Sequence, residues 1–141
     1  MPSNVNQVVN KILEEIQNLP SMSKLAPEKY AETGGYADEF VKGSSDLKSN
    51  QLRKIFHYIK GLKREFDTMG FDRRKVSLVI PRLAYASGRN LIPYDFYKLM
   101  NLCFEKKRCN TKEDFDTAVN FLEAIVAYHK YHENHDRHDR S

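Results

Sequence analysis

Basic and imidazole side chains recur through the middle of the sequence at the spacing of one helix face. The members of this row are Arg53, His57, Lys60 and Arg64. At 3.6 residues per turn they fall in a strip about 60° wide, which flanks the apolar face of the same segment, with Lys54 beyond it. Such a row of cations can follow a phosphate backbone. Only Glu65 and Asp67 are acidic in this helix, so ion pairs within the helix explain the row poorly.

Further basic residues surround this strip in the sequence. Residues 73–75 are Arg-Arg-Lys at the start of the next expected helix, where cations oppose the helix dipole and a bound anion would remove that cost. Arg82 and Arg89 follow, seven residues apart. Arg89 also suits a position after a helix C-terminus without any ligand. These residues extend the candidate anion-binding region to residue 89.

The net charge of +4 hides an uneven distribution. Residues 48–110 contain fifteen Lys and Arg and five Asp and Glu, a net charge of +10. Residues 1–47 and 111–141 each contain four basic and seven acidic residues, a net charge of −3 for each segment. A concentrated basic region favours a polyanion as partner, and the commonest polyanion in a cell is nucleic acid. A basic surface without a partner is the alternative.

Histidines near the C-terminus suggest a second kind of chemistry. They recur every third residue as His129, His132, His135 and His138, with Asp136 and Asp139 among them. Three-residue spacing spreads the side chains around a helix, so not all four could bind one metal ion. His129 also lies on an apolar stripe, which favours a place in the core. We therefore predict no metal site, and a metal-dependent nuclease stays an alternative.

Other signals of catalysis or export are missing from the sequence. There is no nucleophile or metalloprotease motif, and the acidic residues lie mostly at the two ends, away from the basic region. We therefore predict no enzymatic activity and no cofactor. Cys103 and Cys109 are predicted to be free thiols. The first residues do not resemble a signal peptide, and no apolar stretch could span a membrane, so we expect the cytoplasm and no membrane partner.

The elements that must position these residues are helices, because apolar residues recur at helical spacing almost throughout. A single domain, residues 1–141, is predicted, and its fold class is all-α, a compact bundle of five to six helices. Residues from about 132 to 141 are polar and expected to fray. We find no alternating strand pattern and no internal repeat.

Turn and cap residues predict the helix ends. The first helix covers residues 5–19, after Ser3 or Asn4 as N-cap. The second begins at Pro27, and the glycines at residues 34–35 can interrupt it. Ser49 is predicted to cap the third helix, which ends at residues 69–70. In the fourth helix, Pro81 marks a kink or a first turn, and Gly88 follows the helix end. Pro93 opens the fifth helix, and Thr111 with Asp114 forms a capping box at the start of the sixth.

Three stretches, in order, resemble one known family. Residues 46–56 (DLKSNQLRKIF), 80–89 (IPRLAYASGR) and 123–131 (EAIVAYHKY) are similar to segments of the small subunit of the type III-A CRISPR effector, the Csm complex. The resemblance covers about residues 46–131. Lys48, Ser49 and Asn50 depart from the usual Thr-Thr-Ser, and residues 1–45 have no matching motif.

This resemblance implies a helical, non-catalytic subunit of an antiviral defence complex. Its implied partners are guide RNA and target RNA, the backbone and large Csm subunits, and further copies of itself. Because such a subunit must accept any guide sequence, it is expected to contact phosphate and sugar and to leave base edges alone. The resemblance assigns RNA contact to Arg53, Lys54, Arg82 and Arg89. The helix geometry adds Lys48, Lys60 and Arg64.

A helical DNA-binding protein is a further alternative to this interpretation. Helix-turn-helix proteins need a recognition helix with exposed base-reading side chains, and we identify none in the sequence. The nuclease alternative would need acidic residues near the basic face, where the sequence has few.

Overall fold

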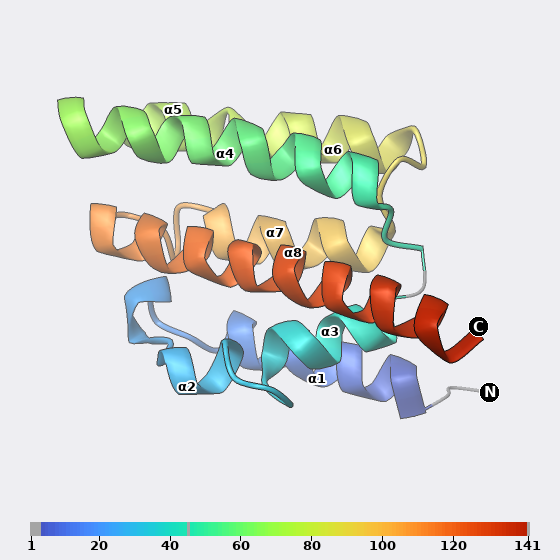
Figure 1. The fold of residues 1–141 in the computed structure, drawn as a ribbon. Coiled ribbons are helices and arrows are strands. Elements are labelled where there is room, and N and C mark those ends of the chain that lie inside the picture. The colour runs from blue at the N-terminus through green and yellow to red at the C-terminus, as the bar shows by residue number, and fades with distance from the viewer. Residues whose placement is uncertain (1–3, 45, 141) are drawn as a thin grey trace.

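The protein folds into helices stacked in three layers (Figure 1). The computed structural model describes the backbone of residues 4–44 and 46–140, and the side chains of residues 7–44 and 46–134. Within those ranges the chain forms helices and no strand, which confirms the all-α prediction. Six helices of this described chain have eight residues or more, in agreement with the predicted five to six. None of the described helices is both long enough and apolar enough to cross a membrane.

The long helix α8 (Lys112–Arg140) lies in the middle layer together with α7 (Tyr94–Phe104). Helix α8 packs against α3 on one side and α4 on the other, while α7 packs against α1 and α6. Helices α7 and α8 therefore lie between the two outer layers. The bottom layer in Figure 1 contains α1 (Asn4–Gln17), the 3-10 turn η1 (Met22–Lys24), α2 (Pro27–Tyr30) and α3 (Tyr36–Gly43). The top layer contains α4 (Ser49–Met69), α5 (Arg73–Ser77) and α6 (Val79–Gly88).

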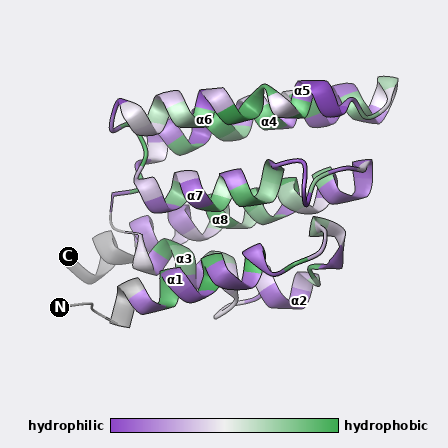
Figure 2. Ribbon diagram, turned by 180° about the vertical axis from the view of Figure 1, so that it is seen from behind, coloured by the Kyte–Doolittle hydropathy of each residue, from purple (hydrophilic) through white to green (hydrophobic). Residues whose placement is uncertain are grey.

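The core fills the space between the layers. Figure 2 shows hydrophobic and hydrophilic residues intermixed along the helices of all three layers, as expected for amphipathic helices. At one end, the Phe115 ring of α8 lies 5.0 Å from Phe66 of α4 and 5.9 Å from Phe104 of α7, measured between ring centroids. All three rings are buried. The predicted apolar stripes thus form one continuous core that fixes the top layer on α7 and α8.

Two glycines separate α2 from α3, as the sequence predicted. Gly34 has a φ of 83°, a conformation that favours glycine. A Cβ at Gly35 would lie 2.7 Å from the carbonyl oxygen of Lys29, so a larger residue does not fit there. The turn places the Gly34 N–H 2.8 Å from a carboxylate oxygen of Asp38, which is buried at the start of α3.

The fourth predicted helix is divided into α5 and α6 at Leu78, and Pro81 lies in the first turn of α6, where proline is tolerated. The predicted role of Gly88 is wrong. Gly88 is the last residue of α6, and the residue with positive φ is Asn90, at 60°. The N–H of Leu91 donates to the carbonyl of Ala86 over 2.8 Å, which is the bond of a Schellman ending. Asparagine tolerates this conformation, so glycine is not required.

One predicted helix cap, at Ser49, is wrong, and the predicted capping box is only partly correct. Ser49 is the first residue of α4, and the cap position is Lys48, which makes no side-chain cap hydrogen bond. The Thr111 hydroxyl accepts a hydrogen bond from the Asp114 N–H over 3.1 Å, as predicted. The Asp114 carboxylate, however, accepts from the N–H groups of Asn110 and Ser23. It therefore fastens η1 to the start of α8 instead of completing the capping box.

The predicted ends of the chain fall partly outside the description. Ser3 lies outside the described residues, and Asn4 begins α1. The backbone of α8 is helical as far as Arg140. Fraying of the segment from about residue 132 stays a prediction.

Candidate nucleic-acid interface

Helices α4 and α6 present most of the predicted RNA-contacting residues on the surface of the top layer. Arg53, Lys54 and Arg64 lie on α4 and are exposed. Lys48 precedes α4, and it is exposed as well. The remaining two exposed residues lie on or beside α6: Arg82 within the helix and Arg89 just after it. We call these six residues the basic face.

The strip predicted on α4 is exposed, except at one residue. Arg53, His57 and Arg64 are exposed, so most of the strip points away from the core and does not flank the apolar face as expected. Lys60 alone leans toward the middle layer. Its Nζ lies 3.7 Å from a carboxylate oxygen of Glu123 on α8 and 5.8 Å from the Phe56 ring centroid. Lys60 is thus partly engaged within the protein.

Arg82 is held against α4 by an aromatic ring. The central guanidinium carbon of Arg82 lies 4.0 Å from the ring centroid of Tyr58. This distance is within the range of a favourable cation–π contact. Because Tyr58 belongs to α4 and Arg82 to α6, the contact joins the two helices of the basic face.

Arg89 is also placed beside a tyrosine. Its Nη1 donates to the hydroxyl of Tyr85 over 3.1 Å, and the guanidinium carbon lies 5.6 Å from the ring centroid. Tyr85 is 64% exposed, so the pair is accessible at the surface. The i,i+4 spacing of Tyr85 and Arg89 on a helix could have revealed this pair in the sequence. Tyr58 and Arg82 are 24 residues apart, and no local signal joins them.

The basic face is not neutralised by acidic side chains. Over the described side chains, none of its six residues forms an ion pair. Arg53 has a neutral partner, the Asn50 side-chain oxygen at 3.3 Å. The acidic residues of α4 are used elsewhere, since Asp67 accepts from Lys63 and Lys112, and Glu65 pairs with Lys75. Exposed cations without acidic partners are suited to contacts with a polyanion.

The anion signal predicted at residues 73–75 has an internal explanation. Nη1 of Arg73 donates to the backbone carbonyl oxygens of Phe104 at 2.7 Å and Cys109 at 2.9 Å. It therefore satisfies one carbonyl at the last residue of α7 and one in the segment that follows. Asp72 caps α5 and pairs with Arg74 at 3.2 Å. Together with the Lys75–Glu65 pair, these contacts give each of the three cations a partner within the protein, although Nε of Arg73 is buried without a hydrogen bond.

Arg108, the most buried cation of the basic segment, also has a structural role. Its side chain is 2% exposed, and it donates hydrogen bonds to the ends of two helices. The acceptors are the carbonyls of Ile16 at 3.1 Å, Gln17 at 2.8 Å and Leu102 at 3.4 Å, and the Glu105 carboxylate at 2.6 Å. Arg108 therefore ties α1 to α7, and its charge is paired with the Glu105 carboxylate.

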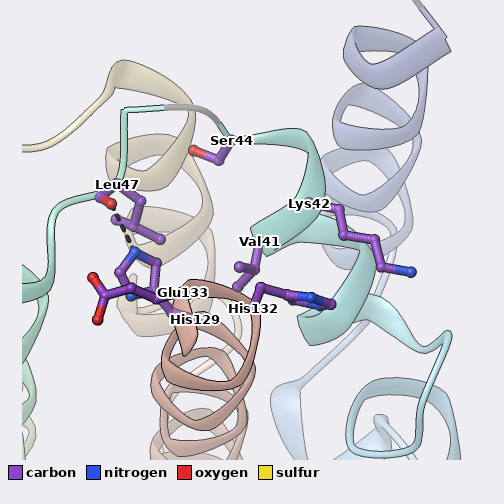
Figure 3. Close-up of a pocket in the computed structure, with 7 residues that line it drawn as sticks. All are labelled: Val41, Lys42, Ser44, Leu47, His129, His132 and Glu133. Carbon is purple, nitrogen blue, oxygen red and sulfur yellow. Dashed lines mark hydrogen bonds between the residues drawn. The ribbon is translucent and has the colours of Figure 1, made fainter. Parts of the chain in front are cut away.

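The described C-terminal histidines are engaged in contacts that position α8. Nε2 of His129 lies 2.7 Å from the Leu47 carbonyl, which can only accept, so this nitrogen is the donor (Figure 3). Nε2 of His132 lies 2.5 Å from the buried carboxylate of Asp38. Burial raises the pKa of Asp38, but the hydrogen bonds from His132 and the Gly34 N–H and the charge of Lys42 offset this and hold its pKa below the usual value.

A cavity of about 400 Å³ lies next to these histidines, with Lys42 and Glu133 in its lining. Figure 3 shows His129 directed to Leu47 on one side of the cavity, and His132 beside Lys42 on the other. Among the side chains that are described, no group of three or more His, Cys, Asp or Glu is placed to hold a metal ion. His135 and His138 lie outside those side chains.

Comparison with known proteins gives one family. The family model described as Csm2 Type III-A matches residues 27–135, most of the chain. The match extends upstream of the three resembling stretches and includes α3, both helices of the basic face and the central helices. Comparisons with curated proteins and with solved structures give no match.

Proposed function

Because the chain belongs to the Csm2 family of type III-A CRISPR small subunits, we propose that it binds RNA backbone through the basic face. In this role it is a non-catalytic subunit that packs beside the backbone and large subunits and further copies of itself. Guide RNA and target RNA are its nucleic-acid partners.

The observation that supports this proposal most directly is the set of six exposed cations on or next to α4 and α6 that have no acidic partner among the described side chains. Arg73, Arg74, Lys75 and Arg108 of the same segment have partners within the fold. Lys98, Lys106 and Lys107 are also exposed without an ion pair, but they lie on α7 or after its end, away from α4 and α6 in the chain. The six residues of the basic face are therefore available for phosphates, whereas the four paired cations are not. Lys60, which the sequence added to the contact residues, is a weaker candidate because it pairs with Glu123.

Backbone contact without base recognition follows from the kind of side chains on this face. Arg53 and Arg64 are eleven residues apart, so the strip extends about 16 Å along α4 and can follow successive phosphates. Arginine and lysine on a convex helix surface reach phosphate oxygens first, and phosphate contacts carry no sequence information. A small subunit of this kind would accept any guide.

The test removes charge from the basic face and measures RNA affinity against salt concentration. The variant is Lys48→Ala, Arg53→Ala and Arg64→Ala together. It leaves out Lys60, whose loss would also break the contact with α8. Three lost phosphate contacts to single-stranded RNA should reduce the magnitude of the slope of log affinity against log salt by about 2. The reduction should be equal for unrelated RNA sequences, in the isolated chain or in the assembled complex.

The control removes the same charge from the opposite layer, with Lys11→Ala, Lys24→Ala and Lys29→Ala. These three lysines are exposed on or near α1, η1 and α2. The control should leave the slope close to that of the unmodified chain. Equal effects of both triple variants would mean that only net charge matters and would refute a basic face. An affinity loss for one RNA sequence alone would refute backbone contact.

A further inference from the structure

The Tyr58–Arg82 contact borders a small notch between α4 and α6. The notch has a volume of about 120 Å³. Its floor is apolar, since it is formed by Ile59, Val79 and Leu83, which are all buried. Its rim includes Lys54, Tyr58 and Arg82. An apolar floor with a cationic and aromatic rim is therefore present within the basic face.

The rim arginine is restrained, although it is exposed. The Tyr58 ring covers one side of the Arg82 guanidinium at 4.0 Å, and the described residues provide no acidic partner. A guanidinium held in this way leaves its opposite side and its N–H groups to a ligand, and it loses little conformational freedom on binding. Arginine planes and aromatic rings are the groups on which proteins stack unpaired bases.

We propose that this notch takes one unstacked nucleotide of the bound RNA, an inference that rests on the proposed function. The base lies against the apolar floor and the Tyr58–Arg82 pair, and Lys54 neutralises the adjoining phosphate. Charge complementarity favours this occupant, because the notch opens on the basic face. The floor residues Ile59, Val79 and Leu83 offer no side-chain hydrogen bond to a base edge, so any of the four bases is accepted.

Tyr58 is the residue whose replacement tests this site without a change of charge. In Tyr58→Leu, the affinity of the full chain for a single-stranded RNA oligomer should fall roughly tenfold, within the range for loss of one stacked base. The salt slope should stay unchanged, because every cation remains. Affinity for a blunt RNA duplex of equal length should change little, since its bases are paired and cannot enter the notch. Tyr58→Phe should bind like the unmodified chain.

Two further variants test whether the loss of affinity comes from removal of any exposed tyrosine or from disturbed folding. Tyr131→Leu removes a tyrosine that is 58% exposed on α8, and it should leave both affinities unchanged. Arg82→Lys keeps the charge at an exposed position and loses the planar group, so it should reproduce the selective loss even if Tyr58→Leu disturbs folding. Thermal unfolding of each variant separates the two effects.

The outcomes distinguish this site from the proposed function. Equal losses on single-stranded and duplex RNA would overturn the nucleotide site, because Tyr58 would then only orient Arg82 toward phosphates. Unchanged RNA affinity with release of the chain from the assembled complex would mean that a protein side chain fills the notch, and the inference would be wrong. If the unmodified chain and its complex bind neither RNA, the proposed function fails first.

Discussion

Replacing Arg108 by methionine should destabilise the protein more than any change to the basic face. Methionine keeps much of the aliphatic volume and removes the guanidinium, which is buried where α1 and α7 end. The change leaves the carbonyls of Gln17 and Leu102 without this donor and Glu105 without its cation. The effect measures how strongly one buried charge ties the bottom layer to the middle layer.

The size of the loss follows from the remaining partners. Removing one member of a buried, hydrogen-bonded charge pair costs about 3–5 kcal/mol. The Glu105 side chain is 35% exposed, so its carboxylate regains water when Arg108 is removed. The Ile16 carbonyl still accepts from the Leu19 N–H at 3.1 Å. The cost should therefore lie near the lower end, at about 3 kcal/mol, a large part of the 5–15 kcal/mol typical of a domain.

Urea unfolding followed by circular dichroism provides the assay. The midpoint should fall while the slope of free energy against urea stays the same, since the fold is retained and only its stability changes. Arg74→Met is the matched control, because the Arg74 side chain is 92% exposed and has a surface partner in Asp72. If Arg108→Met shifts the urea midpoint no more than Arg74→Met does, the argument from burial is refuted.

Two other predictions concern buried groups that titrate. Asp38→Asn should lower the urea midpoint at pH 7, and the difference in midpoint from the unmodified chain should shrink below about pH 4. The pKa of Asp38 in the folded protein is depressed. The carboxylate therefore stabilises the fold above its unfolded-state pKa, and this contribution is lost as the pH falls through the folded-state pKa. Equal differences at pH 7 and pH 3 would contradict this. Burial raises the pKa of Cys109 to about 12 and also raises the pKa of Cys103, so a thiol reagent at pH 8 should label both only after unfolding. Rapid labelling of the folded protein would contradict the burial of these thiols.

The sequence alone determined the helices and much of the surface. Apolar spacing, proline and glycine predicted the all-α class, the break at Gly34 and Gly35, and an interruption of the helix near Pro81, because these signals act within a few residues of the chain. Periodicity also placed Arg53, His57 and Arg64 on one side of α4. The order of three short stretches indicated the family that the comparison with family models then gave.

Local signals did not decide the role of a residue where one residue type could serve two purposes. Gly88 and Asn90 both suit a helix ending, and the hydrogen bond from Leu91 to Ala86 decides for Asn90. His129 and His132 match a metal-binding spacing, yet their described contacts are with Leu47 and Asp38, more than 80 residues away in the sequence. Their roles depend on how α8 lies against α3 and the segment before α4.

Only the tertiary structure decided which cations have internal partners and which do not. Arg73 and Arg108 belong to the same basic segment as Arg53 and Arg82, and composition cannot separate them. Arg73 and Arg108 donate to carbonyl oxygens at the ends of helices packed beside them, whereas Arg82 rests on Tyr58 from another helix. Helical periodicity in the sequence indicates which side of one helix a residue occupies. The groups that face this side depend on packing between helices, which no local pattern contains.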